Sequence, residues 1–207
     1  EPVREAVREW PQRDRSDEWA VYDLGADMLD SAGPNGVIVG LGGETTLVRY
    51  FRDVLSRRPD LQVVWADAED TRLAAVAAAA AHSAPVYLTR DLPGAAARYS
   101  LDAAGPLIAV SPKAATGPIP PGDDVGGGVR WLAGSTHIRQ THAGPVVRVA
   151  VEWTAAAPIT EDLKVSARLL DAAGAVVVAD DRVPVHFTYP TTAWVPGEVV
   201  ADVYDLA

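Results

Sequence analysis

Cysteine is absent from the 207 residues of this chain. The sequence therefore excludes disulfide bonds, a thiolate nucleophile and any zinc site built on cysteine. Lysine occurs only at Lys113 and Lys164, and the net charge is -10. Nucleic acids and anionic lipids are bound through clustered Lys and Arg, so this balance argues against a polyanionic partner, and we expect no nucleic acid.

A long apolar run is also missing. The longest candidate, 73–81, is flanked by Asp70, Arg72 and His82, and it is shorter than the roughly 18 residues that a membrane-spanning helix needs. We therefore expect no transmembrane segment here. The chain begins at Glu1 without a Met and without a signal peptide, so we interpret it as an excised part of a longer protein.

Hydrophobic residues make up 48% of the chain and charged residues 22%, which is typical of a folded globular protein. The length allows one large domain or two small ones, and we predict two. They are an α/β domain over 1–112 and an all-β domain over 129–207. A Gly/Pro-rich linker over 113–128 is expected to separate them, because its composition disfavours regular structure.

Three short apolar runs organise the first domain, at 36–40, 61–65 and 85–89. They lack polar alternation, which is typical of strands buried on both faces. The stretches 44–58 and 69–82 between them are long enough for crossover helices. The sequence therefore predicts a β-α-β-α-β unit with a small parallel sheet, helices on both faces and right-handed crossovers.

The α/β domain is expected to include segments on either side of that unit. Residues 1–15 are rich in charges of both signs, and Ser16 is a good helix N-cap. Apolar residues then recur at helical spacing from Trp19 to Leu29, which predicts a helix lying on the sheet. Residues 98–112 are interpreted as one or two edge strands around a turn.

A glycine-rich turn follows the first strand, at 40–44. Backbone N–H groups at such a turn can bind phosphate, but neither G-x-G-x-x-G nor G-x-x-x-x-G-K-[ST] fits here, so the spacing favours a tight strand-to-helix turn over an anion site at Gly42 and Gly43. Ligands of open parallel sheets lie beyond the carboxyl ends of the strands, which brings Glu44, Asp67 and Arg90 into one neighbourhood. An ion pair between Arg90 and a carboxylate is the simpler interpretation.

The second half changes to a period of two residues, for example along 147–153 and 164–169. Each such strand has one core face, and turn residues at 171–174 and 196–197 separate short strands, so we predict an antiparallel β-sandwich. Its aromatic residues Tyr189, Trp194 and Trp131 are candidates for stacking on sugar rings if they are exposed. A Trp beside Pro196 is more typical of a core plug at a strand end.

Metal-ligating residues do not form a convincing set. His137 and His142 are five residues apart, which directs them to opposite faces of a strand, and His186 is distant in sequence. Asp123 and Asp124 lie in the predicted linker and are interpreted as solvated side chains. We expect no metal site, no cofactor and no catalytic residue.

Several stretches nevertheless resemble a known group of proteins. In the first half these are 14–17, the strand before Gly40, 58–64, 85–89, 98–101 and 105–107; in the second half they are 151–153, 168–174 and 190–202. Together they look like the C-terminal soluble tail of bacterial polytopic membrane proteins related to protein O-mannosyltransferases and lipid-linked-sugar glycosyltransferases, including the DUF2723 family.

The resemblance implies a parent protein that spans the membrane many times and carries this tail on the extracytoplasmic face. The catalytic carboxylates of that group lie between its membrane helices, so none can be carried over to this chain. Sandwiches in such proteins usually continue with another strand pair after the segment that corresponds to 198–206. We therefore expect a smaller or incomplete sandwich here.

Three hypotheses about function follow. The first is a non-catalytic accessory region that positions an acceptor, a glycan or a lipid-linked sugar next to its own upstream membrane domain. The second is a stand-alone carbohydrate-binding module that uses Tyr189, Trp194 and Trp131. The third is a nucleotide- or phosphosugar-binding enzyme with a pocket at Gly42, Gly43, Asp67 and Arg90.

Overall fold

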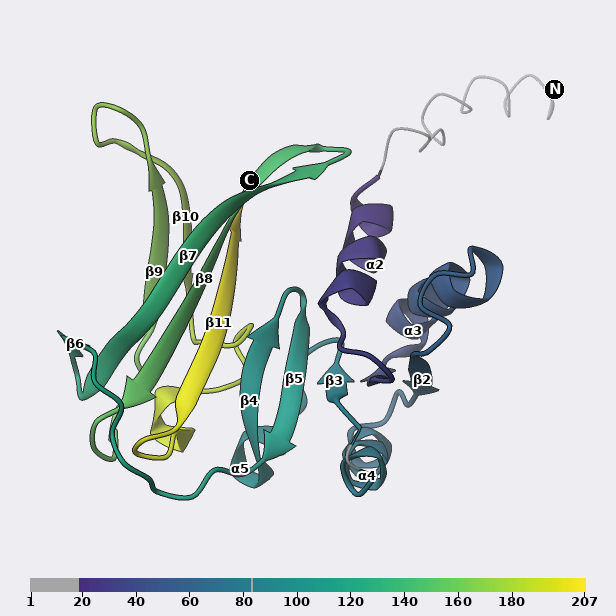
Figure 1. Cartoon of the computed structure of the whole chain (residues 1–207), viewed down its shortest axis with the longest axis horizontal. Helices are drawn as coiled ribbons and strands as arrows, with labels where there is room; N and C mark the ends of the chain where they lie inside the picture. Colours follow the sequence, from purple (N-terminus) through teal and green to yellow (C-terminus); the bar gives the residue numbers. More distant parts are fainter. Residues whose placement is uncertain (1–18, 83) are drawn as a thin grey trace, which may run out of the picture.

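The computed structural model describes residues 19–82 and 84–207. The charge-rich stretch 1–15 and the predicted cap at Ser16 lie outside these residues. The described chain has a mixed α/β fold with three sheets, which we name A, B and C (Figure 1). None of the helices in this part of the chain is long and apolar enough to cross a membrane.

Sheet A contains the predicted β-α-β-α-β unit. Its strand order is β2-β1-β3-β5-β4. The strands β1, β2 and β3 are parallel, whereas β5 pairs antiparallel with both β3 and β4, so the sheet is mixed. The bounds are β1 (Val37–Gly40), β2 (Gln62–Trp65), β3 (Val86–Leu88), β4 (Tyr99–Ala104) and β5 (Leu107–Pro112).

The prediction that all three apolar runs are buried on both faces is correct for two of them. Every residue of β1 and β3 is buried. It is wrong for β2, whose terminal Trp65 is 59% exposed. The strand order gives the reason, because β2 is one of the two edge strands of sheet A and has β1 as its one neighbour among the described strands.

Helices cover both faces of sheet A. The helix α2 (Ala20–Ser31) and the helix α3 (Gly42–Arg49) pack on one face with Ile38, and α4 (Glu69–Ala80) packs on the other through Val76 (Figure 1). A close approach at Gly25 joins α2 to the region around α3, since a Cβ there would meet the Phe51 ring at 2.5 Å. The three-layer arrangement predicted for this half is therefore present.

The helix predicted over 44–58 ends earlier than expected. Its last turn widens into a π-helix, η1 (Tyr50–Val54), and both Ser56 and Arg58 have positive φ. The short helix α5 (Ala95–Arg98) precedes β4. The Arg58 side chain then donates to the carbonyls of Leu29 and Ala32, so it links this turn to the end of α2.

The second half forms two antiparallel sheets. Sheet B has the order β11-β8-β7-β6, and sheet C is the ribbon β10-β9. The period-two segments are strands as predicted, but the packing of these sheets as a sandwich stays a prediction. The bounds are β6 (Asp123–Gly126), β7 (Val129–Thr141), β8 (Gly144–Ala155), β9 (Val165–Leu170), β10 (Val176–Arg182), η2 (Thr191–Ala193, a 3-10 turn) and β11 (Val199–Leu206).

Two observations refine the predicted division of the chain. The linker is not wholly irregular, because β6 lies within 113–128 and pairs with the start of β7. The two halves also share one hydrophobic cluster, in which Val39 and Leu101 of sheet A lie with Val200 of sheet B. The division into two domains at 113–128 stays a prediction, and the sheets contact each other across it.

A buried ion-pair network adds to the contact between the halves. Arg148 on β8 donates to Asp27 on α2 at 2.6 and 3.0 Å, and to Asp205 on β11 at 2.6 and 2.7 Å. Arg139 on β7 lies 2.9 Å from the same Asp27 carboxylate. Both side chains of the central pair are more than nine-tenths buried, so this network fixes α2 against sheet B.

Candidate functional site

The predicted neighbourhood at the carboxyl ends of β1, β2 and β3 exists. The backbone N–H of Gly42, in the first turn of α3, donates to Asp67 Oδ1 at 2.9 Å. Arg90 Nε, after β3, donates to Glu44 Oε1 at 2.7 Å. The parallel order of the three strands therefore brings together the four residues that the sequence indicated.

The groups of this neighbourhood are used by one another. Glu44 Oε2 accepts the hydroxyl of Thr89 at 2.5 Å and the N–H of Leu41 at 3.4 Å. The N–H of Gly42 lowers the pKa of Asp67, and the Trp65 side chain adds to this effect. The donor that an anion would need is thus already bound to a carboxylate, which favours the structural interpretation of this turn.

The two glycines at this turn differ in what surrounds them. A Cβ at Gly42 would lie 3.2 Å from the Trp65 indole nitrogen, whereas a Cβ at Gly43 would meet nothing within 4 Å. Gly43 therefore occupies an ordinary position in the first turn of α3, and only Gly42 is needed for a close approach.

Tyr189 and Trp194 are not exposed aromatic residues. Tyr189 is 0% and Trp194 4% exposed, so neither ring is available at the surface for stacking, and the interpretation of Trp194 as a core plug is confirmed. The Tyr189 hydroxyl donates to Glu198 at 2.8 Å and accepts from Lys113 at 2.7 Å. Burial is the first reason that the pKa of Tyr189 is raised, and the neighbouring carboxylate of Glu198 adds to it.

Lys113 is a central residue that the sequence analysis did not identify. Its ammonium group donates to the carbonyls of Ala96 at 3.0 Å and Ala193 at 2.7 Å, in addition to Tyr189. Burial lowers its pKa. Lys113 therefore ties α5 to η2, and the only sequence signal for it was the scarcity of lysine.

A cleft of about 460 Å³ lies beside Trp194, between the β6–β7 turn and the start of β9. We call it the ribbon cleft. Its walls are mainly apolar, and Lys164 and Ser166 contribute polar groups. Of the predicted aromatic residues, Trp194 lines it while Trp131 does not. The lining residues are Val125, Gly126, Gly127, Val129, Trp153, Leu163, Lys164, Val165, Ser166, Thr191 and Trp194.

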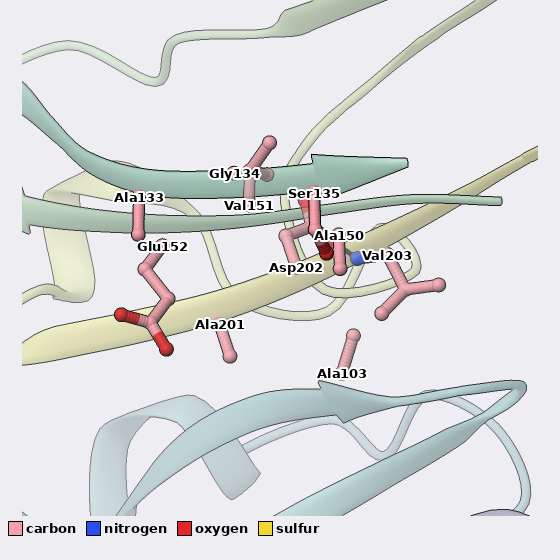
Figure 2. A pocket seen from close by; sticks show the side chains of 10 residues that line it. All are labelled: Ala103, Ala133, Gly134, Ser135, Ala150, Val151, Glu152, Ala201, Asp202 and Val203. Atoms are coloured by element: carbon pink, nitrogen blue, oxygen red, sulfur yellow. Dashed lines mark hydrogen bonds between the residues drawn. The ribbon is translucent and has the colours of Figure 1, made fainter. Parts of the chain in front are cut away.

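A second cleft of about 270 Å³ lies between β4 and sheet B. Figure 2 shows Ala103 of β4 facing small side chains of sheet B, with the carboxylate of Glu152 at one end. Its side chains are mostly small, with Ser135 as a hydroxyl group. This cleft offers two acids, Glu152 and Asp202, and no aromatic ring, which is a poorer set of groups for holding a sugar than that of the ribbon cleft.

The histidines do not converge. His142 Nδ1 lies 2.5 Å from Asp23 Oδ1 and its ring stacks on Trp19, whereas His186 Nε2 donates to the carbonyl of Gly105 at 2.8 Å. Burial lowers the pKa of His186. Within residues 19–82 and 84–207 there is no group of three or more His, Asp or Glu side chains that could hold a metal ion.

Comparison with known proteins adds no relative: no family model, no curated protein and no solved structure matches this chain. The candidate sites therefore rest on the geometry described above. That geometry separates a carboxyl-end cluster whose groups are bound to each other from a ribbon cleft with tryptophan walls and a lysine.

Proposed function

We propose that this chain is a non-catalytic accessory region of a membrane glycosyltransferase-like protein, and that it positions a glycan or acceptor in the ribbon cleft. Its partner is the protein's own upstream membrane domain, and its place is the extracytoplasmic face of the membrane. In this proposal sheets B and C form a small β-sandwich. The resemblance of 14–107 and 151–202 to such tails is the sequence argument.

The observation that carries the binding role is the composition of the ribbon cleft. Its volume of about 460 Å³ lies within the roughly 300–1,000 Å³ of typical ligand sites. Trp153 in its wall, which is half-buried, provides apolar surface of the kind on which sugar rings stack. By contrast, the residues at the carboxyl ends of sheet A are bound to each other, which argues against the enzyme hypothesis.

The polar groups of the ribbon cleft have separate roles. Thr191 Oγ1 accepts from the N–H of Leu163 and donates to the carbonyl of Glu161, so it shapes the wall. Lys164 forms no hydrogen bond or ion pair with the described residues. Its ammonium group is therefore the polar group most available to a bound glycan.

The experiment is a titration of the chain with a panel of oligosaccharides, followed by calorimetry or by NMR. We expect Trp153→Ala to weaken binding by tenfold or more, because one stacked ring contributes about 1–3 kcal/mol. Lys164→Gln is the second variant, since it does not disturb the core. Trp65→Ala is the matched control, because Trp65 is an exposed tryptophan on the far edge of sheet A.

Absence of binding across the panel, or equal binding by wild type, W153A and K164Q, would contradict this function. The accessory role is distinguished from a stand-alone carbohydrate-binding module by the gene upstream of the codon for Glu1. Apolar segments of roughly 20 residues there support the accessory role. A start codon immediately before Glu1 would favour the module.

A further inference from the structure

Within the part of the chain that the structure describes, one side of β7 is without a strand partner over most of its length. β7 has 13 residues, and β6 pairs only with Val129, Arg130 and Trp131 at its start. From 132 to 141, β8 lies on one side, and no described strand lies on the other. Residues 133–138 are all exposed, so these six residues present to solvent an edge that no described strand covers.

The register shows which backbone groups point out from this edge. β7 and β8 are joined by the two-residue turn His142–Ala143. In a two-residue hairpin the residues that flank the turn, here Thr141 and Gly144, form a hydrogen-bonded pair, and such pairs then alternate along the strand. The odd-numbered residues of β7 therefore hydrogen-bond to β8 through their backbone. Gly134, Thr136 and Ile138 direct their N–H and C=O groups outward.

The same alternation, continued through β8, directs the backbone N–H and C=O groups of the odd-numbered residues of β11 away from β8. Two contacts on β11 agree with it. The N–H of Ala201 donates to Asp102 at 2.8 Å, and the carbonyl of Val203 accepts from Arg182. The outward direction of the even-numbered groups on β7 is thus supported by hydrogen bonds at the opposite edge of sheet B.

This edge carries few of the features that usually protect edge strands. Natural edges are short, or carry Pro, charged side chains or bulges that prevent pairing with another chain. Between 130 and 143 there is no Pro, no Lys and no acidic residue. A single irregularity lies near Leu132, at the end next to β6. A strand with these properties is expected to be covered in the working protein.

We propose that the edge of β7 pairs antiparallel with the same edge of a second copy, about a two-fold axis at Thr136. Outward groups are on even-numbered residues, so even residues must face even residues. With Thr136 opposite itself, 133–139 of one copy pairs with 139–133 of the other. The two B sheets then form one continuous sheet, with six strands across the shared edge and β6 at the end of each β7, in a closed, symmetric dimer.

The side chains in this register are self-complementary. Ile138, which is 65% exposed, lies opposite Gly134 of the second copy. The Trp131 ring already covers Gly134, since a Cβ there would lie 3.2 Å from the indole. Each Ile138 therefore packs against the indole ring that covers Gly134, and the two-fold axis repeats this contact.

Charge also favours a second copy in this register. The charged or titratable residues within 132–140 are His137 and Arg139. The pairing places His137 opposite Ser135 and Arg139 opposite Ala133, so no like charges face each other directly. The acidic residues that give the chain its net charge of -10 lie outside this stretch. The pairing does not depend on the proposed glycan function.

The decisive experiment uses the absence of cysteine in the chain. In Thr136→Cys the two Cα atoms at the axis are about 5.5 Å apart, which suits a disulfide. In Ile138→Cys, the matched control, they are offset by four residues, or about 13 Å. We expect oxidation to give a covalent dimer for T136C and little for I138C. Equal dimer yields for the two variants would overturn the register.

Light scattering of the unmodified chain at increasing concentration tests the dimer itself. We expect a dimer mass, and at least a tenfold weaker association for Thr136→Pro, which removes an outward N–H at a position where an edge strand tolerates proline. Ile138→Ser is a second variant without any backbone effect, and it should weaken association too. Circular dichroism verifies that both fold. A wild-type chain that stays monomeric at 100 µM would overturn the proposal.

Discussion

Sheet A and sheet B differ in how far their strands are buried and in how many strand neighbours these have. In sheet A, β1 and β3 are wholly buried, with strands on both sides and helices on both faces. In sheet B, the middle of β7 is exposed and has one strand neighbour. Polar side chains at the carboxyl ends of the sheet A strands hydrogen-bond to each other. By contrast, the outward N–H and C=O groups of β7 have no described strand beside them. The comparison shows that sheet A contributes strands that are wholly buried, whereas sheet B contributes an exposed strand edge.

We expect the largest difference in the loss of unfolding free energy between substitution of a core residue near sheet A and substitution of an edge residue of sheet B. Phe51 is 0% exposed and packs on Tyr22 and against Gly25. Phe51→Ala should lower the unfolding free energy by about 3–5 kcal/mol, through lost burial and a cavity. Ile138→Ala should change that of the monomer by less than about 0.5 kcal/mol. Urea denaturation of dilute protein measures both, and similar losses would refute the contrast.

Arg148→Met tests the contact between the two regions. The substitution leaves the buried carboxylate of Asp27 with Arg139 as its remaining charged partner and the Ser31 hydroxyl as a neutral donor. We expect a loss of about 3 kcal/mol, because a buried charge loses most of its compensation. The double variant Asp27→Leu with Arg148→Met should recover most of that loss, since an apolar pair needs no partner. Thermal unfolding monitors this, and a double variant less stable than the single one would contradict the explanation.

Substitution by alanine at two glycines near the end of β1, Gly40 and Gly43, should change the stability of the protein in opposite directions. A Cβ at Gly40 would collide with the Thr89 side chain, so Gly40→Ala should destabilise by about 1–3 kcal/mol. Gly43 lies in a helix with open space around it, so Gly43→Ala should stabilise by roughly 0.5–1 kcal/mol. Calorimetry tests the pair. A destabilised G43A would reopen the question of a close ligand approach at this turn.

The smallest expected effect depends on pH. Burial raises the pKa of Asp102, and nearby Glu198 and Glu152 contribute. Because the folded-state pKa lies above the unfolded value of about 3.9, the folded protein binds more protons in that window, and its stability falls as pH rises through it. Asp102→Asn keeps an acceptor for Ala201 and should raise stability at pH 7, by less than about 1 kcal/mol.

This gain in stability should shrink as pH falls. It should vanish below about pH 4, where Asp102 is protonated in both the folded and the unfolded state. Asp91→Asn is the control, because Asp91 is exposed. Urea denaturation between pH 4 and pH 8 measures the difference. A gain that does not vary with pH would point to hydrogen bonding and not to charge as its origin.

The arrangement of β1, β3 and their crossover helices could be predicted because apolar runs of strand length alternate with helix-length segments. The exposure of β2 could not, since a run of residues does not reveal its place in the strand order. The early end of the helix over 44–58 depends on positive φ at Ser56 and Arg58, for which neither residue type is a signal. β6 forms in a Gly/Pro-rich stretch because β7 offers it hydrogen bonds.

The candidate site was predictable in part for the same reason. Strand order brings Glu44, Asp67 and Arg90 together, and simple ion pairing was the correct interpretation of Arg90. The burial of Tyr189 was not predictable, because it depends on Lys113 and Glu198, which come from distant segments. Between 183 and 198 the sequence has no period of two or of 3.6 that would assign faces.

The shared hydrophobic cluster has a consequence for how the chain matures on the ribosome. Val200 is synthesised well after Val39 and Leu101, yet it is buried with them in one cluster. Domains synthesised first can usually fold while the rest of the chain emerges. Here the nascent first half keeps part of its apolar surface uncovered until β11 has left the exit tunnel, so the arrival of β11 sets the moment at which this surface is protected from aggregation.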